Sequence, residues 1–190
     1  MGTNYPWTLT IVASGDSLRG FPFSALRNVG EVWAINYASR DLPFATRIIA
    51  GDGRMAGYPK HVPVYCWHRR RPHHQETDII VRQHGKGINR RKGFVGRKSH
   101  SPFCALNLAV NEGHKNILVL GCDNTGARHY YDPEDALIPM RHDRYEANLA
   151  EFAYGLLPEE TVTLVGSALQ IDGFSYLSMD EYLAFLKANK

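Results

Sequence analysis

Residues 99–124, SHSPFCALNLAVNEGHKNILVLGCDN, decide the fold class of this chain of 190 residues. Small and apolar residues between Pro102 and Gly113 have the spacing of a buried helix, and Gly113 is a typical C-terminal stop. The apolar run Ile117 to Leu120 follows as a buried strand and ends abruptly at Gly121-Cys122-Asp123-Asn124. The stretch therefore predicts a helix that feeds a strand, with polar residues beyond both ends.

The same alternation extends over the rest of the chain. We expect further strands at Trp7–Ala13, Val32–Ile35, Ala45–Ala50, Pro63–Trp67 and Val162–Val165. We expect helices at Tyr145–Leu156 and at Asp180–Lys187, the latter capped by Ser178, and a short helix at most over Ser24–Val29. Strands that alternate with helices predict an α/β fold, a three-layer sandwich with a mostly parallel sheet, in a single domain over residues 1–190.

Composition places few limits on function. The chain is 44% hydrophobic and 22% charged, which is typical of a soluble globular protein. No apolar run approaches the ~18 residues of a membrane span, and the N-terminus lacks the features of a secretory signal. We therefore expect a cytoplasmic protein without a membrane partner.

The three cysteines do not form a disulfide framework. Cys104 and Cys122 lie inside apolar patterns and are predicted to be buried small hydrophobes. Cys66 is followed by His68, His73 and His74, but this spacing matches no closed tetrahedral zinc site.

The net charge of +3 conceals a strong asymmetry. Residues 68–100 hold ten Lys or Arg against two acids, which makes this segment +8 and leaves −5 for the rest of the chain. Such a basic loop or lid indicates a polyanion or a phosphate group as a partner, although a solvated surface loop explains it as well. The candidate phosphate or nucleic-acid contacts in its later half are Arg90, Arg91, Arg97 and Lys98, and the aromatic ring available there for base stacking is that of Phe94.

Polar residues follow five of the predicted strands: Ser14-Gly15-Asp16-Ser17, Asn36, Gly51-Asp52-Gly53, Cys122-Asp123-Asn124 and Gly166-Ser167. Ligands of open parallel sheets bind at the carboxyl ends of the strands, so this repetition predicts a binding site at that edge. The turn at Gly15 can face a phosphate with its backbone N–H groups. The hydroxyls of Ser99 and Ser101 can also bind a ribose or phosphate, and Ser101 is equally suited as N-cap before Pro102.

Three segments in order, IVASGDSL (residues 11–18), VWAINYASRDLPFATRIIAGD (32–52) and SPFCALNLAVNEGHKNILVLGCD (101–123), resemble a Rossmann-like superfamily. It comprises bacterial sialyltransferases, the motility-associated Maf glycosyltransferases, an archaeal pterin diphosphokinase group and phage-encoded relatives. The resemblance spans nearly the whole chain and implies a nucleotide-dependent transferase. It also implies a phage-encoded relative, which would be located in the host cytoplasm.

The resemblance also implies roles for individual residues. The first loop, Ser14 to Leu18, matches the family's phosphate loop, and Asn36 matches its nucleotide-binding asparagine. Asp52 matches a polar residue after the third strand, and Ser101 a hydroxyl that contacts the nucleoside.

Beyond Asp123, the family uses tyrosine hydroxyls on the leaving phosphate, a place that Tyr130 and Tyr131 occupy here. His142 matches a histidine general base ahead of the next helix. A neutral histidine can accept the proton of an acceptor hydroxyl, and tyrosine donors can stabilise the leaving group without a metal.

Two departures from the family pattern affect the choice of donor. Ser14 replaces an asparagine and Asp16 a proline, and an extra carboxylate beside a phosphate loop repels an anionic donor unless a cation intervenes. This leaves room for a different nucleotide, or for Mg²⁺ held by Asp16, Asp52 or Asp123.

Three functions remain open from the sequence. The first is a small glycosyltransferase-like enzyme that binds a nucleotide or nucleotide-sugar at the strand ends. The second is a Mg²⁺-dependent diphosphokinase acting on a pterin or nucleoside. The third is a nucleic-acid or nucleotide-binding protein without catalysis that uses the basic segment.

Overall fold

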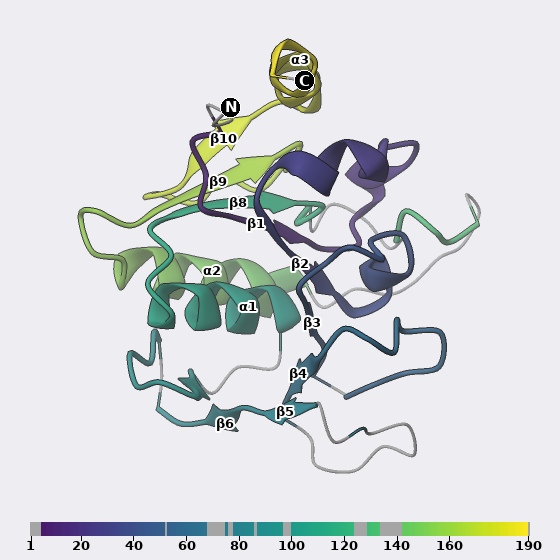
Figure 1. Cartoon of the computed structure of the whole chain (residues 1–190). Helices are drawn as coiled ribbons and strands as arrows, with labels where there is room; N and C mark the ends of the chain where they lie inside the picture. The colour runs from purple at the N-terminus through teal and green to yellow at the C-terminus, as the bar shows by residue number, and fades with distance from the viewer. Residues whose placement is uncertain are drawn as a thin grey trace.

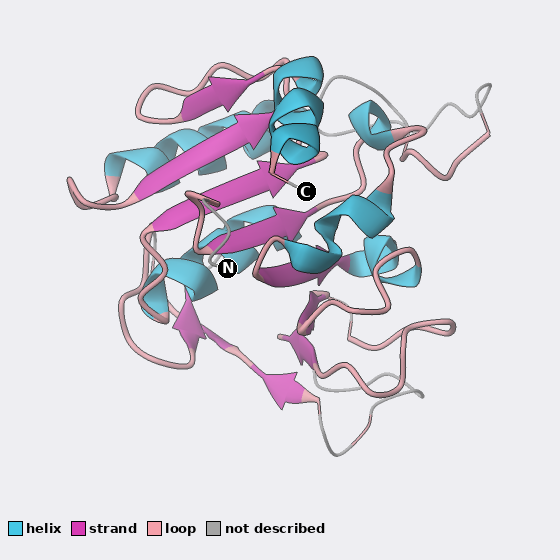
Figure 2. Cartoon of the chain, turned by 45° about the horizontal axis from the view of Figure 1, so that its top comes forward, coloured by secondary structure: helices cyan, strands magenta, loops and turns pink. Residues whose placement is uncertain are grey.

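The computed structural model of the chain describes residues 5–51, 53–67, 75, 78–85, 87–96, 100–123, 129–133 and 142–189, without the side chains of 142–145. Its centre is an eight-stranded sheet in the order β10-β9-β8-β1-β2-β3-β4-β5, and every neighbouring pair is parallel (Figures 1 and 2). The strands are β1 Leu9–Val12, β2 Glu31–Ile35, β3 Arg47–Ile49, β4 Val64–Cys66, β5 Ile79–Ile80, β8 Asn116–Leu120, β9 Thr161–Val165 and β10 Ser175–Leu177.

A second, two-stranded parallel sheet pairs β6 (Arg82–Gln83) with β7 (Phe94–Val95). Three α-helices complete the fold: α1 Ser101–Asn111, α2 His142–Tyr154 and α3 Met179–Ala188. The connections after β1 and β2 form three short 3₁₀ helices: η1 Asp16–Leu18, η2 Phe23–Asn28 and η3 Asn36–Arg40.

The large sheet lies between two apolar layers. Helices α1 and α2 lie side by side on one face, where Phe103, Leu149 and Phe152 belong to a core cluster with Ile11 and Val119 of the sheet (Figure 1). The opposite face is covered by the 3₁₀ helices and α3, whose residues form a second cluster with the sheet: Leu18, Leu26, Tyr182, Leu186, Val12, Leu118 and Leu120. The predicted three-layer α/β sandwich is confirmed.

Alternation along each strand explains why both layers form. In β8, Ile117 and Val119 face α1 and α2, whereas Leu118 and Leu120 face the other layer. A parallel sheet covered on both sides needs apolar residues at every position, and the four apolar residues of β8 are fully buried.

Element boundaries differ from the expectations by a few residues. Helix α1 begins at Ser101, and its N-cap is His100, which makes no side-chain capping hydrogen bond. The expectation of Ser101 as N-cap is therefore wrong, and Pro102 lies one position further into the helix. Ser178 caps α3 as predicted, in a capping box with Glu181. The predicted burial of Cys104 and Cys122 is also confirmed.

Four strands were not expected from the sequence: β5, β6, β7 and β10. Each has only two or three residues, which is too short for a periodic pattern to be recognised. The backbone pairing that defines them comes from neighbouring segments, such as Gly93, whose carbonyl accepts a hydrogen bond from the N–H of Arg82 at 3.1 Å.

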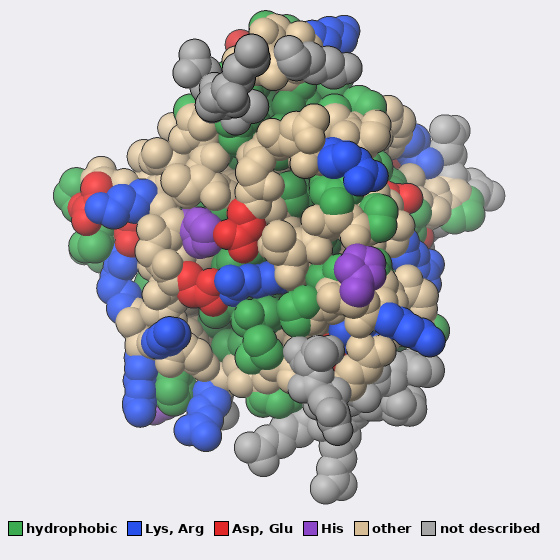
Figure 3. All heavy atoms as spheres, viewed as in Figure 1, with side chains coloured by type: hydrophobic (Ala, Val, Ile, Leu, Met, Phe, Trp, Pro, Cys, Tyr) green, Lys and Arg blue, Asp and Glu red, His purple; other side chains and the backbone are tan. Residues whose placement is uncertain are grey.

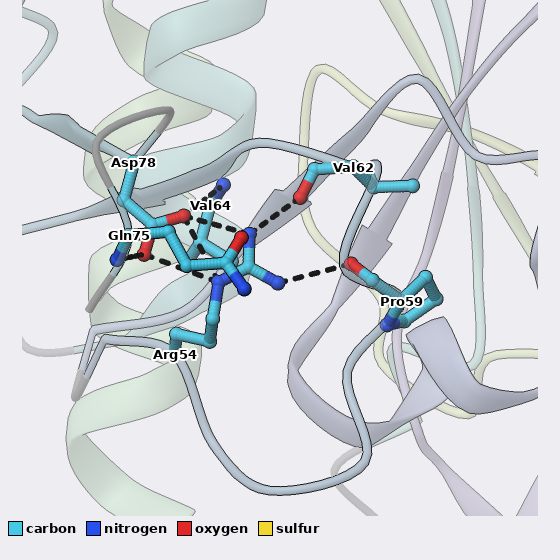
Figure 4. A network of polar contacts seen from close by, with 6 residues as sticks. All are labelled: Arg54, Pro59, Val62, Val64, Gln75 and Asp78. Atoms are coloured by element: carbon cyan, nitrogen blue, oxygen red, sulfur yellow. Dashed lines mark hydrogen bonds and ion pairs between the residues drawn. The ribbon is translucent and has the colours of Figure 1, made fainter. Parts of the chain in front are cut away.

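A buried ion pair fastens the connection between β3 and β4. Nη2 of Arg54 lies 2.7 Å from Oδ1 of Asp78, and both side chains are almost completely buried (Figure 4). The guanidinium also donates to the carbonyl oxygens of Pro59 and Val62, at 2.9 and 2.7 Å. The guanidinium of Arg54 thus joins the loop that leads into Val64 to Asp78, which precedes β5.

In the part of the chain that the structure describes, no helix is long and apolar enough to cross a membrane.

Candidate functional site

The strand order reverses between β1 and β8, and in open parallel sheets such a switch point forms a crevice at the carboxyl ends of the two strands, the region called the crevice below. From β1 the chain proceeds through β2 to β5 on one side, and β8, β9 and β10 extend the sheet on the other. Such a switch point is where open parallel sheets bind their ligands. Ser14 and Asp123 follow the two strands at this point, and Asn36 follows β2 next to them. The register therefore brings these predicted site residues to one edge.

Asp123 holds the loop that follows β1. Its carboxylate accepts a hydrogen bond from the backbone N–H of Ser17 at 2.7 Å and another from the Ser17 hydroxyl at 2.5 Å. Burial raises the pKa of this carboxyl above its ordinary value, and nearby Asp16 adds to the effect, although the two hydrogen bonds act in the opposite direction. Asp123 is thus occupied in shaping the loop.

Gly15 is required by the close approach of this loop to the end of β8. A Cβ atom at this position would lie 2.5 Å from the carbonyl oxygen of Gly121 and 2.6 Å from Cγ of Asp123. The N–H of Gly15 donates to the same carbonyl at 2.8 Å. The N–H of Gly15, predicted to face a phosphate, is therefore bonded within the protein, and the glycine lets two strand ends meet.

The carboxylate of Asp16 has a cation beside it. Oδ1 accepts hydrogen bonds from Nε and Nη2 of Arg19, at 3.0 and 2.8 Å. Nη2 of Arg19 also donates to the carbonyl oxygen of Asp132 at 3.0 Å. The repulsion expected from Asp16 is consequently offset by Arg19, which also ties the first loop to residues 129–132.

Ser14, His129 and Tyr131 form the polar centre of the crevice. Oγ of Ser14 lies 2.9 Å from Nδ1 of His129, and the interaction of the Tyr131 hydroxyl with Ser14 acts to lower the pKa of that hydroxyl. The imidazole is stacked on the Tyr131 ring, with 5.1 Å between the ring centroids. Burial raises the pKa of Tyr131, so its hydroxyl keeps its proton at neutral pH.

The backbone fixes this cluster in place. The N–H of Tyr130 donates to the carbonyl oxygen of Ser14 at 3.1 Å, and an isolated antiparallel bridge joins Gly15 to His129. The N–H of His129 donates to the carboxylate of Asp132 at 2.8 Å. His129 is therefore positioned by its own loop as well as by Ser14.

Tyr130 points to the other side of its loop. Its hydroxyl donates to Oδ2 of Asp41, and its ring contacts Phe23. Burial and the Asp41 carboxylate together raise the pKa of Tyr130 well above its ordinary value. The sequence predicted the same role, binding of the leaving phosphate, for both tyrosines, but their surroundings differ. The hydroxyl of Tyr130 is hydrogen-bonded to Asp41, whereas that of Tyr131 interacts with Ser14.

A cation also lies at the second strand's end. The guanidinium carbon of Arg40 lies 4.0 Å from the ring centroid of Tyr37, and its charge acts on both Tyr130 and Tyr131. Tyr37 in turn makes an edge contact with Tyr131, at 6.0 Å between centroids. Arg40 is exposed, so a bound anion at this edge can reach it.

Asn36 adopts a backbone conformation that few side chains tolerate. Its φ of +50° lies in the left-handed region, where asparagine is among the best-tolerated residues after glycine. It directly follows the last residue of β2 and is the first residue of η3. This conformation turns the chain sharply at the edge where the nucleotide is predicted to bind.

Ser101 reaches the same edge from a helix. Helix α1 leads into β8, so its C-terminus lies at the amino edge of the parallel sheet and its N-terminus at the carboxyl edge. Ser101 and His100, both partly exposed, stand at that N-terminus.

The remaining predicted residues are not brought to the crevice or lie outside the described part. Arg90 forms an ion pair with Glu160, at 2.7 Å, and donates to the carbonyl oxygen of Gly155. Arg91 lies over the Phe94 ring. Outside the described residues lie Ser99, Asp52, Arg97, Lys98 and the side chain of His142, which begins α2 and does not precede it.

Sequence analysis missed four residues of the crevice: His129, Tyr37, Arg40 and Arg19. The run His129-Tyr130-Tyr131 was a signal for the first of these, because it follows a strand end and holds three polar rings. The two arginines have local partners, Asp16 and Tyr37, each three residues away, but no sequence pattern indicated that Arg19 also reaches Asp132.

Two of the three carboxylates suggested for Mg²⁺ are hydrogen-bonded to protein groups, and the third, Asp52, lies outside the described residues. Oδ1 of Asp16 accepts from Arg19, and both oxygens of Asp123 accept from Ser17. Within the described ranges, no group of three His, Cys, Asp or Glu side chains has the arrangement of a metal site. The suggested zinc ligand Cys66 is fully buried, and burial raises the pKa of its thiol to about 11.

Comparison with known proteins gives a relationship in fold. No protein-family model matches the chain, and no curated protein matches its sequence. A solved structure of a Maf glycosyltransferase from Magnetospirillum magneticum AMB-1 superposes on it with a TM-score of 0.55. The two proteins share a fold. The alignment covers 96% of this chain and 37% of the Maf glycosyltransferase, at 12% identity.

The match to the Maf glycosyltransferase confirms one part of the resemblance seen in the sequence. The chain has the Rossmann-like α/β fold that was expected, and a Maf-type structure is related to it. At 12% identity the relationship concerns the fold alone, and the chain spans little more than a third of the Maf glycosyltransferase.

Proposed function

We propose that this protein is a nucleotide-dependent transferase, similar to glycosyltransferases, whose donor binds at the carboxyl ends of β1, β2 and β8. The observation that carries the proposal is the Ser14–His129–Tyr131 cluster at the point where the strand order reverses. Proton-handling groups gathered at a switch point favour a catalytic site over a structural one. The shared fold with a Maf glycosyltransferase supports transfer of a sugar as the reaction class.

The donor's nucleotide binds across the strand ends in this proposal. Asn36 and Ser101 contact the nucleoside, and the loop from Ser14 to Ser17 lies against the phosphates. Arg40 supplies the positive charge that an anionic donor needs, because it is exposed at the end of η3. Arg19 neutralises Asp16, so that the loop does not repel the phosphates.

The chemistry requires one proton acceptor and one hydrogen-bond donor. The bond between the anomeric carbon and the phosphate oxygen breaks, and its electron pair stays on the phosphate. The acceptor's oxygen bonds to the anomeric carbon and releases its proton to a base. His129 takes this proton, and the hydroxyl of Tyr131 donates to the leaving phosphate. Ser14, which contacts both residues, keeps the imidazole in its orientation.

His142 remains an alternative base on the strength of the sequence resemblance. It begins α2, and its side chain lies outside the described part of the structure. Replacement of each histidine by glutamine separates the two assignments. Only the replacement of the true base should lower the rate constant of transfer while leaving donor affinity unchanged.

The first test is a thermal-shift panel with CMP, UMP, GMP and AMP, their di- and triphosphates, and either Mg²⁺ or EDTA. A ligand present at about 100 times its Kd adds about 2.7 kcal/mol to stability, which is readily detected. We expect a shift with one nucleoside mono- or diphosphate, unchanged by EDTA and lost in the Ser14→Ala and Arg40→Gln variants.

Other outcomes of this panel would change the proposal. A shift with ATP that depends on Mg²⁺ would favour the diphosphokinase alternative, with Asp52 as a candidate ligand. No shift with any nucleotide would contradict the proposed function.

A further inference from the structure

A groove of about 410 Å³ opens beside the small sheet, away from Ser14 and His129. Its lining comes from the residue after β4 and from both strands of the small sheet: Trp67, Ile80, Val81, Arg82, Gln83, His84 and Phe94. We call it the aromatic–basic groove, after Trp67, Arg82, His84, Phe94 and neighbouring Arg91.

Two aromatic rings form its apolar part. Trp67 packs closely over Gly51, where a Cβ atom would lie 2.5 Å from the indole ring. Phe94 is partly exposed and belongs to none of the buried clusters. Trp67 packs against the core cluster that contains Phe103 and is only partly buried, and Gly51 leaves room for its indole. A flat, partly exposed ring of this kind can stack with a nucleic-acid base.

Two guanidinium groups flank Phe94. The guanidinium carbon of Arg91 lies 4.4 Å from its ring centroid and that of Arg82 lies 5.8 Å from it. Both arginines are exposed and form no ion pair with any described acidic residue. Their charges are consequently available to a bound anion.

The segment that contains most of the groove, residues 79–96, carries only positive charge. Residues 79–96 contain basic side chains and no Asp or Glu. The acid that precedes them, Asp78, is buried against Arg54 (Figure 4). Lys and Arg side chains gather at the lower left of the face shown in Figure 3, in the region of β6. Arg90 is the exception, because Glu160 neutralises it.

We propose that the aromatic–basic groove binds a single-stranded nucleic acid, with bases stacked on Trp67 and Phe94 and phosphates paired with Arg82 and Arg91. Stacking platforms bordered by arginines are how proteins hold single strands without reading their sequence. Duplex bases are already stacked on one another, so they cannot use the exposed faces of the two rings. This proposal is independent of the transferase activity, because it involves none of the residues of the crevice.

The test is fluorescence anisotropy with labelled single-stranded DNA and RNA of the same sequence and with the matching duplex, at several salt concentrations. We expect the single strands to bind more tightly than the duplex. The slope of log K against log salt should become shallower by about 0.7 for each arginine removed in Arg82→Gln and Arg91→Gln. Phe94→Leu should weaken binding about fivefold or more at constant slope.

A matched control uses an arginine that lies over a phenylalanine ring elsewhere in the protein. Arg27 lies over the ring of Phe44 at 5.1 Å, far along the chain from the groove, so Arg27→Gln and Phe44→Leu should leave binding unchanged. Quenching of Trp67 fluorescence on binding gives a second readout, which a Trp67→Phe variant should abolish. Equal losses in the groove and control variants, or equal affinity for duplex and single strand, would overturn the proposal. So would an absence of binding at low salt.

Discussion

The hydroxyl of Ser14 lies 2.9 Å from Nδ1 of His129, although 115 residues separate them in the chain. Two strand ends and one loop have to meet for this contact to form, since Ser14 follows β1 and His129 pairs with Gly15. The pair gives the crevice a group that can exchange a proton with a bound substrate.

The first prediction concerns His129. Its replacement by glutamine should lower the rate constant of transfer about 10²-fold, because general acid–base catalysis contributes at least this much. Nucleotide affinity should stay within a few-fold of the wild type. Steady-state kinetics with the nucleotide identified by the thermal-shift panel measures both quantities.

His61→Gln serves as the control for this prediction. The ring of His61 is hydrogen-bonded to the carbonyl oxygen of Pro43 on an exposed loop, away from the crevice. A loss of activity in His61→Gln as large as in His129→Gln would remove His129 from the mechanism.

A second prediction follows from the link between Asp123 and Ser17. Asp123→Asn removes the charge that accepts both Ser17 hydrogen bonds, and hydrogen bonds to a charged group contribute about 1.5–3 kcal/mol. The variant should therefore unfold at lower urea concentration than the wild type.

The pH dependence of this difference has a definite sign. Because burial raises the folded-state pKa of Asp123, the stability gained from its bound proton is present below the ordinary value of 3.8. This gain is lost as pH rises through the raised pKa. The gap in stability between wild type and Asp123→Asn should thus narrow with rising pH, and a gap that widens would contradict the prediction.

The Arg54–Asp78 pair provides a third prediction, on stability. Arg54→Met or Asp78→Leu alone leaves one buried charge without its partner, which typically costs about 3–5 kcal/mol. Arg54→Met together with Asp78→Leu should cost much less than the sum of the single changes. Urea titrations of the four proteins measure this coupling, and additive effects would show that the pair is not coupled.

Acid should weaken the same ion pair. Burial raises the pKa of Asp78, but hydrogen bonds from Arg54 and from the N–H groups of Gln75 and Val64 outweigh it and leave the pKa below its ordinary value. Its contribution to stability is complete above 3.8 and is lost as pH falls through the lowered pKa. This loss should be absent from the double variant.

The fourth prediction concerns the three thiols. Cys66, Cys104 and Cys122 are all buried, and burial raises the pKa of Cys66 to about 11 and that of Cys104 to about 12. Thiolates are the reactive form, so the native protein should not react with a thiol reagent near pH 8. All three should react in urea. Fast modification of one thiol in the native protein would show that it is accessible.

Asn36 gives a fifth prediction, which separates stability from binding. Asn36→Gly should keep the stability of the wild type or raise it, because glycine adopts a φ of +50° without strain. Asn36→Leu should lower stability by about 1 kcal/mol. Both variants should bind the nucleotide more weakly. Unchanged affinity in Asn36→Gly would place the asparagine in the turn alone and not in the binding site.

The sequence by itself determined the layers of the fold and the edge that bears the polar residues. Local periodicity in the sequence predicts buried strands and helices, and β8 with its preceding helix α1 is the clearest case. Parallel pairing then requires Ser14, Asn36 and Asp123 to meet at one edge, whatever the loops do.

Only the tertiary structure decided which of those residues face one another. The contact of Ser14 with His129 and that of Arg19 with the carbonyl oxygen of Asp132 depend on the paths of loops, which local patterns do not encode. The same holds for β5, β6 and β7, whose two-residue strands exist only because a neighbouring segment pairs with them. Periodicity records whether a side chain is buried, whereas the identity of its partner depends on distant parts of the chain.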